Sequence, residues 1–291
     1  MASFSQAIVI AVLRAQGRKK RWADGATLVA TARAERREGP TAAPTAGSDK
    51  VTLTTHTVAG FAVHTIRPRL QNPAAPTVLF LHGGGYIHDF ATWHWRYLTK
   101  IVERTGATVL AAQYPLAPEH TWRDSFDALL SIARTVDVVM GDSAGGGYAL
   151  ALAQRLAAEG IARDAVLIAP ALDMTMSDPD TARYDARDPW LATDGVLHCG
   201  RAWAGGDDPA RIEVSPLFGE LAGLGRVLVF TGTRDVLHPQ ALDLARRLPG
   251  LELVIAPGCV HNYPILPITK HALRSKLLPN FWPWSVNALH S

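Results

Sequence analysis

Six short runs of mostly apolar residues alternate along the chain with longer segments rich in alanine and leucine. The runs are dominated by valine, isoleucine and leucine, which is typical of strands buried on both faces of a parallel sheet. They occupy residues 77–82, 107–113, 136–140, 165–170, 226–232 and 251–256. Because helical patterns separate them, the sequence predicts an α/β fold with a mostly parallel central sheet and helices on both of its faces.

Two segments upstream of these runs have a different pattern. Residues 51–58 and 61–68 alternate more clearly between apolar and polar positions, and Ala59 and Gly60 separate them. This arrangement predicts an antiparallel hairpin at one edge of the sheet, which brings the expected strands to about eight. The helices expected between the strands include 93–106, 124–134, 146–160 and 238–248.

Two regions fall outside the alternation of strands and helices. Residues 1–48 begin with a helical pattern and end in a loop-like stretch, and residues 171–225 form a long insertion between two expected strands. Long excursions from a compact α/β domain commonly serve as lids. We therefore predict a single domain over residues 1–291, with a small helical cap contributed by 1–48 and 171–225.

Composition and charge exclude several classes of protein. Hydrophobic residues make up 48% of the chain and charged residues 19%, so a globular fold is expected. The net charge is only +3, and the one basic run, GRKKRW at 17–22, is interpreted as a solvated helix end, so no nucleic-acid partner is predicted. Cys199 and Cys259 lack the spacing of a metal or redox site, and we expect neither a metal nor an organic cofactor.

The apolar run at residues 7–13 is too short to span a bilayer and lacks the flanking features of a signal peptide. The sequence therefore predicts a cytoplasmic protein without stable membrane insertion, whose partner is a small molecule. It leaves the oligomeric state open, with a homodimer among the states it allows.

The stretch VVMGDSAGGGYALALAQRL, residues 138–156, passes from a strand pattern to a helix pattern through several glycines. It contains G-x-S-x-G, in which Gly141 and Gly145 flank Ser143. Between a strand and a helix, this pattern predicts a sharp turn that exposes a nucleophilic serine near the positive end of the helix dipole. A phosphate-binding loop is disfavoured, because no lysine followed by serine or threonine comes after these glycines.

A serine nucleophile needs a histidine base, and the base needs a carboxylate that fixes its tautomer. His261 lies in a loop just after the last expected strand, and Asp235 lies just after the strand before it. Functional groups of open parallel sheets collect at the carboxyl ends of the strands. Ser143, Asp235 and His261 therefore form the predicted catalytic triad, in the order expected for an α/β-hydrolase.

The stretch LHGGGY, residues 81–86, follows an expected strand and offers main-chain N–H groups that no side chain obstructs. Such groups can bind the oxyanion of a tetrahedral intermediate. The predicted oxyanion hole is formed by Gly83, Gly84, Gly85 and Ala144. His82 is expected to hold this loop by hydrogen bonding.

The motif HGGG upstream of GDSAGG resembles the hormone-sensitive lipase branch of the α/β-hydrolase esterases. The resemblance covers roughly residues 51–275 and includes the stretches YPLAPEH (114–120), SPLFGELAGL (215–224) and GTRDVL (232–237). It implies a carboxylesterase acting on short- to medium-chain acyl esters, with a cap over the site.

Residue by residue, the resemblance assigns the nucleophile to Ser143, the acid to Asp235 and the base to His261. The loop after HGGG departs from the family pattern, because it carries His88 and Asp89 where relatives commonly have glycine and small residues. This departure affects the shape of the pocket.

Four aromatic or histidine side chains are candidates for substrate binding: Tyr86, His88, Trp190 and Trp203. Two alternatives to the esterase remain open. A triad does not select its leaving group, so the protein could be a deacetylase or an amidase of small metabolites. A non-catalytic small-molecule receptor on the same fold is the alternative from a different class.

Overall fold

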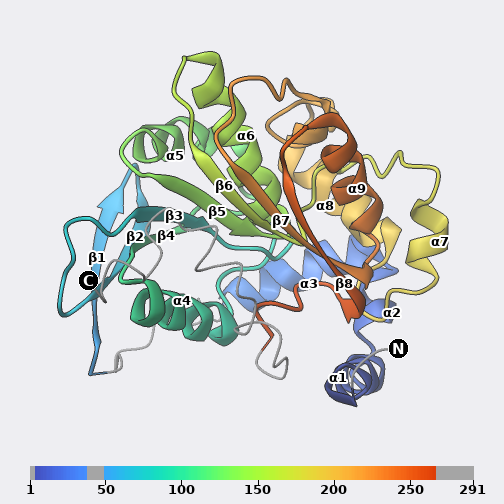
Figure 1. Cartoon of the computed structure of the whole chain (residues 1–291). Helices are drawn as coiled ribbons and strands as arrows, with labels where there is room; N and C mark the ends of the chain where they lie inside the picture. Colours follow the sequence, from blue (N-terminus) through green and yellow to red (C-terminus); the bar gives the residue numbers. More distant parts are fainter. Residues whose placement is uncertain (1–3, 38–48, 267–291) are drawn as a thin grey trace.

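The computed structural model describes residues 4–37 and 49–266, and its centre is one eight-stranded sheet (Figure 1). The strand order is β1-β2-β4-β3-β5-β6-β7-β8. The first two strands form the predicted hairpin, β2 pairs with β4 in the antiparallel sense, and β3 to β8 are parallel. The strands are β1 (Val51–Val58), β2 (Phe61–Pro68), β3 (Thr77–Leu81), β4 (Thr108–Gln113), β5 (Val138–Asp142), β6 (Asp164–Ile168), β7 (Val227–Arg234) and β8 (Glu252–Val260).

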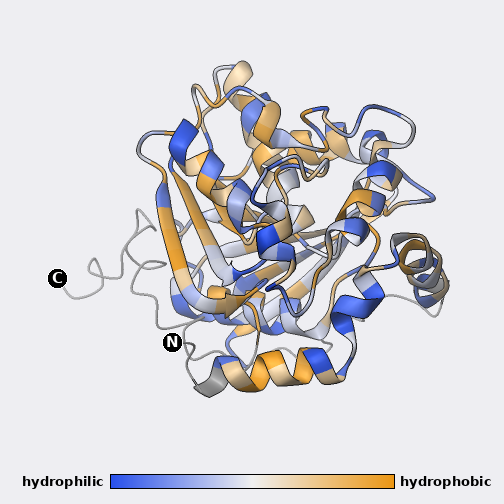
Figure 2. Ribbon diagram, turned by 90° about the vertical axis from the view of Figure 1, so that its right-hand side faces the viewer, coloured by the Kyte–Doolittle hydropathy of each residue, from blue (hydrophilic) through white to orange (hydrophobic). Residues whose placement is uncertain are grey.

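Helices cover both faces of this sheet, which confirms the predicted fold class. Helix α4 (Thr92–Thr105) lies on one face, whereas α5 (Phe126–Ala133), α6 (Ala144–Ala158) and α9 (His238–Arg247) lie on the other (Figure 1). Strand β3 is apolar from Val78 to Leu81 because its side chains enter the cores on both faces of the sheet. Leu79 and Leu81 belong to the core that contains α5 and α6, and Val78 and Phe80 belong to the core beneath α4. Figure 2 shows long hydrophobic stretches on the strands, and hydrophobic and hydrophilic residues alternating along most helices.

The N-terminal helices and the insertion pack against each other beside the carboxyl ends of the parallel strands (Figure 1). The N-terminal helices are α1 (Phe4–Ala15), α2 (Arg18–Trp22) and α3 (Gly25–Arg37), and the insertion contains α7 (Thr181–Asp185) and α8 (Thr193–Ala204). Lys19 Nζ donates to the carbonyl of Leu191 at 3.0 Å, and the Gly25 N–H donates to Asp194 Oδ2 at 2.8 Å. These bonds fix α2 and α3 to the insertion.

Short 3-10 helices, η1 (Trp122–Asp124) and η2 (Pro216–Phe218), complete the elements that the structure describes. No helix in 4–37 or 49–266 combines the length and the apolar character needed to cross a bilayer. The loop expected at the end of 1–48 lies outside the described residues, as does the tail at 267–291.

Candidate active site

Ser143 occupies the turn between β5 and α6, as the G-x-S-x-G pattern predicts. Its backbone has φ 52° and ψ −123°, a conformation that residues other than glycine rarely adopt. Four main-chain hydrogen bonds hold the turn: the Ser143 N–H donates to the carbonyl of Ile168 at 2.8 Å, and the Ser143 carbonyl accepts from residues 146, 147 and 171. The strained turn is therefore fixed by the surrounding backbone.

The two glycines of this motif are required by close contacts between main-chain segments. A Cβ on Gly145 would lie 2.0 Å from the carbonyl oxygen of Leu81, and one on Gly141 would lie 2.2 Å from the carbonyl oxygen of Gly145. Any larger residue would push α6 away from β3 and β5. The glycines therefore bring the turn that carries Ser143 next to the HGGG loop.

Asp235 and His261 lie together directly after neighbouring strands. Asp235 follows β7 and His261 follows β8, and Asp235 Oδ2 lies 2.8 Å from His261 Nδ1. The other carboxylate oxygen of Asp235 accepts the N–H of Leu237 at 2.9 Å. Both side chains are buried, so this pair holds the imidazole in one orientation.

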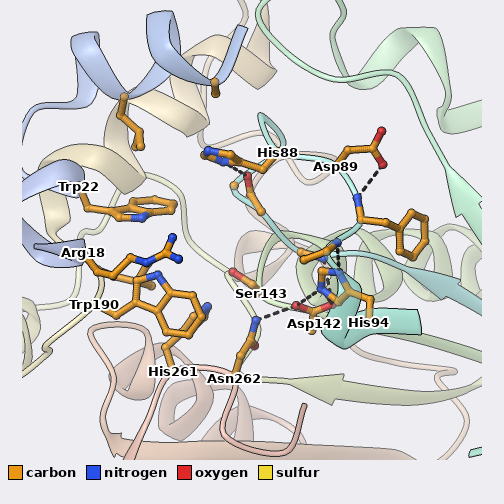
Figure 3. Close-up of a pocket in the computed structure, with 18 of the residues that line it drawn as sticks. Arg18, Trp22, His88, Asp89, His94, Asp142, Ser143, Trp190, His261 and Asn262 are labelled. Carbon is orange, nitrogen blue, oxygen red and sulfur yellow. Dashed lines mark hydrogen bonds and ion pairs between the residues drawn. The ribbon is translucent and has the colours of Figure 1, made fainter. Parts of the chain in front are cut away.

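Ser143 and His261 line the same cavity, which has a volume of about 280 Å³ (Figure 3). Ser143 is 7% exposed, and its Oγ forms no hydrogen bond with any residue in the described ranges. Asp235 does not line the cavity and lies behind His261. The rings of Trp190 and His261 are nearly perpendicular, with centroids 5.6 Å apart.

A second carboxylate, Asp188, lies near the Asp235–His261 pair. Its oxygens accept main-chain N–H groups from Trp190 at 2.7 Å, Leu191 at 3.0 Å and Val236 at 2.9 Å. Burial, followed by the charge of Asp235, raises the pKa of Asp188 to about 7. Asp188 thus ties the insertion to the loop that carries Asp235. No motif in the sequence points to Asp188.

The Asp235 carboxylate changes the proton affinity of His261. Burial favours the neutral imidazole, but the hydrogen-bonded Asp235 carboxylate outweighs burial and raises the pKa of His261, with a further contribution from Asp188. Burial lowers the pKa of His82, whose Nδ1 lies 2.8 Å from the carbonyl oxygen of Gly83. These opposite directions favour His261 over His82 as a base, and His82 contacts its own loop as expected.

The HGGG loop presents fewer free N–H groups than predicted. The Gly83 N–H donates to Asp142 Oδ1 at 2.9 Å and cannot also bind an oxyanion, so its assignment to the oxyanion hole is corrected. The N–H groups of Gly84, Gly85 and Ala144 have no acceptor among the residues that the structure describes. These three groups remain available beside Ser143.

Asp142 is fully buried and connects three segments around the site. Besides the Gly83 N–H, it accepts Asn262 Nδ2 at 2.7 Å and lies 3.4 Å from His94 Nε2 (Figure 3). Burial alone would raise the pKa of Asp142, but His94 and the Gly83 N–H outweigh it and lower that pKa. Asp142 therefore joins the HGGG loop, α4 and the His261 loop. Sequence reasoning missed His94 and Asn262 in this role.

Comparison with known protein families identifies the family to which the chain belongs. Residues 78–265 match a protein family that is described as having the α/β-hydrolase fold. This match covers more than half of the chain and includes all three predicted triad residues. The chain belongs to the α/β-hydrolase fold family. The match thereby confirms that the chain is an α/β-hydrolase, as the motifs HGGG and GDSAGG predict.

Similar proteins include esterases and lipases. An esterase of Acinetobacter venetianus is 30% identical over 182 residues, which are 58% of this chain and 60% of that protein. A triacylglycerol lipase of Mycobacterium tuberculosis is 31% identical over 225 residues, which are 71% of this chain and 46% of that protein. The match thus spans only about half to three fifths of these relatives. The crystal structure of an esterase/lipase from an uncultured bacterium has a TM-score of 0.76 and 25% identity, and the match covers 93% of this chain and 95% of that one.

The four predicted substrate-binding residues of this α/β-hydrolase fall into two groups. His88 and Trp190 line the cavity (Figure 3). Tyr86 and Trp203 do not line it, because both rings are fully buried and stack on each other with centroids 4.6 Å apart. Their assignment to substrate binding is therefore corrected: they belong to the core between the HGGG loop and α8.

The basic run at 17–22 is more than a solvated helix end. It forms α2, of which Lys20 is exposed while Arg18, Arg21 and Trp22 line the cavity. Lys19 pairs with Asp185 at 3.3 Å. The N-terminal segment therefore supplies part of the cavity wall.

Proposed function

We propose that this α/β-hydrolase is a serine carboxylesterase that hydrolyses short- to medium-chain acyl esters through an acyl-enzyme. The observation that carries the proposal is the 2.8 Å contact between His261 and Asp235 at a cavity that Ser143 also lines. The similarity to esterases and lipases supports the same reaction class.

The proposed reaction has two halves. His261 takes the proton of Ser143 as Oγ attacks the ester carbonyl carbon, and the N–H groups of Gly84, Gly85 and Ala144 bind the developing oxyanion. His261 then donates that proton to the leaving alcohol, which leaves an acyl group on Oγ. Water activated by His261 attacks the acyl group, the acid is released, and the serine regains its proton.

We also propose that α1 to α3 and the segment 171–225 form the cap of the site. Support comes from the packing of α2 and α3 on α8, and from cavity-lining residues in both segments, including Trp22 and Trp190. These segments lie on one side of Ser143, and the HGGG loop lies on another (Figure 3).

The size of the cavity favours small acyl groups. A volume of about 280 Å³ lies just below the range of small-molecule pockets, roughly 300–1,000 Å³. In a series of 4-nitrophenyl esters from acetyl to palmitoyl, kcat/KM is expected to be highest for acyl chains of up to about eight carbons. Highest kcat/KM with palmitoyl would contradict the proposed preference, and turnover of none of the esters would contradict the proposed function.

The proposed base also predicts how activity depends on pH. His261 must be neutral to accept the serine proton, and its pKa is raised. Activity is therefore expected to fall as the pH decreases through a midpoint above 6.5, the ordinary value for histidine. A profile of kcat/KM against pH measures this midpoint, and a single acid limb centred well below 6.5 would argue against His261 as the base.

A further inference from the structure

Three arginines line the cavity of this α/β-hydrolase, and two of them form ion pairs with carboxylates. Arg21 forms an ion pair with Glu35, and Arg36 forms one with Glu119. Arg36 also donates to a main-chain carbonyl, that of residue 87. These two guanidinium groups are therefore engaged within the protein.

The third arginine, Arg18, has no carboxylate partner among the described residues. Its Nε donates to Gln16 Oε1 at 3.1 Å, and its two terminal nitrogens bond to no residue within 4–37 or 49–266. The side chain is half-buried. A guanidinium keeps its charge at all physiological pH values, so Arg18 contributes a positive charge to the cavity wall.

Arg18 reaches into the cavity that Ser143 also lines. Figure 3 shows its guanidinium between the rings of Trp22 and Trp190, on the side of the cavity where His261 also lies. Neighbouring Lys19 anchors the same helix to the carbonyl of Leu191, which limits the movement of Arg18. The free edge of the guanidinium can form two parallel hydrogen bonds with a carboxylate.

The opposite side of the cavity is less suited to an anion. Asp89 lies there, across Ser143 from Arg18 (Figure 3). Its oxygens accept the Phe90 N–H and Gln113 Nε2, each at 2.6 Å. Among the described residues, the cavity therefore has a cation without a carboxylate partner on one side and a carboxylate with hydrogen-bond donors on the other. An ester with one negative end would bind in a single direction.

From this arrangement we infer that the substrate is an ester carrying a carboxylate, which the Arg18 guanidinium binds while Ser143 attacks the ester carbonyl. The carboxylate is carried by the branch of the ester, acyl or alcohol, that binds on the side of the cavity where Trp22 and Trp190 lie. This inference rests on the proposed esterase function and specifies its substrate class.

Two pairs of esters that differ only in charge test this inference. In the first pair, mono-4-nitrophenyl adipate and the 4-nitrophenyl ester of adipamic acid, the charge is on the acyl branch. In the second pair, 4-acetoxybenzoate and 4-acetoxybenzamide, it is on the alcohol branch. The measured quantity is the ratio of kcat/KM for the charged ester to that for its neutral partner, in wild type and variants.

In at least one pair we expect wild type to prefer the charged ester and Arg18→Gln to lower the ratio by about tenfold to a hundredfold, the effect of losing a charged hydrogen bond. Arg18→Lys should keep part of the preference. Lys20→Gln is the matched control, because Lys20 is an exposed cation on the same helix that does not line this cavity. Its ratio should equal that of wild type.

The pair that responds to Arg18→Gln identifies the branch that carries the carboxylate. An unchanged ratio in both pairs, or an equal fall in Lys20→Gln, would overturn the inference. In either case turnover of the neutral esters by wild type would leave the proposed esterase function intact. If wild type hydrolysed none of the four esters, the proposed function itself would fail.

Discussion

Replacing Ser143 with alanine is expected to lower kcat for 4-nitrophenyl butyrate by about 10⁴- to 10⁶-fold. The reason is that the proposed reaction forms a covalent bond to Oγ, and no other hydroxyl lies on this strained turn between β5 and α6. Alanine removes only the oxygen, so substrate binding and KM should change little. Steady-state kinetics on the purified variant measure both quantities.

Ser131→Ala provides a matched control for this experiment. Ser131 lies exposed on α5, where its hydroxyl donates to the carbonyl of Asp127 at 2.9 Å, and it does not line the cavity. This variant should retain wild-type kcat. If folded Ser143→Ala kept more than about a hundredth of the wild-type kcat, Ser143 could not be the nucleophile.

The second large effect is expected for Asp235→Asn, which should lower kcat by about 10⁴-fold. The asparagine is nearly the same size, but its amide can donate a hydrogen bond to His261 Nδ1. This contact favours the tautomer with a proton on Nε2, and that nitrogen can then no longer accept the serine proton. The loss of the carboxylate also removes the charge that raises the pKa of His261.

The pH dependence of the remaining activity of Asp235→Asn is therefore also expected to change. Its acid limb should move to lower pH than in wild type, which a purely structural defect would not cause. Asp243→Asn is the control, because Asp243 lies on α9 and pairs with Arg246 at 3.0 Å, away from the cavity. Nearly full activity in Asp235→Asn, or an equal loss in Asp243→Asn, would rule out the assigned role.

The strands could be predicted because their apolar character has one physical cause. A central parallel strand such as β3 packs side chains into both cores, so each position from Val78 to Leu81 is apolar and the run is visible in the sequence. The hairpin was predictable from its alternation and from the glycine between its strands. The loops after β5, β7 and β8 then follow from the topology, and with them the neighbourhood of Ser143, Asp235 and His261.

Details of the site depend on tertiary contacts that no sequence pattern encodes. Three consecutive glycines look equivalent, yet only Gly83 is bonded to Asp142, since that carboxylate lies directly beneath it. Tyr86 and Trp203 have the composition of pocket residues, but they stack in the core because α8 packs over the HGGG loop. In the same way, the position of Arg18 depends on how α2 docks on the insertion.

Covalent labelling with a fluorophosphonate, which reacts with activated serines, tests directly whether Ser143 is an activated nucleophile. Intact mass and peptide mapping should find one adduct per chain, on Ser143, and labelling should be far slower in Asp235→Asn. Folded wild-type protein that remains unlabelled, or that carries its adduct on another residue, would contradict the claim that His261 and Asp235 activate Ser143.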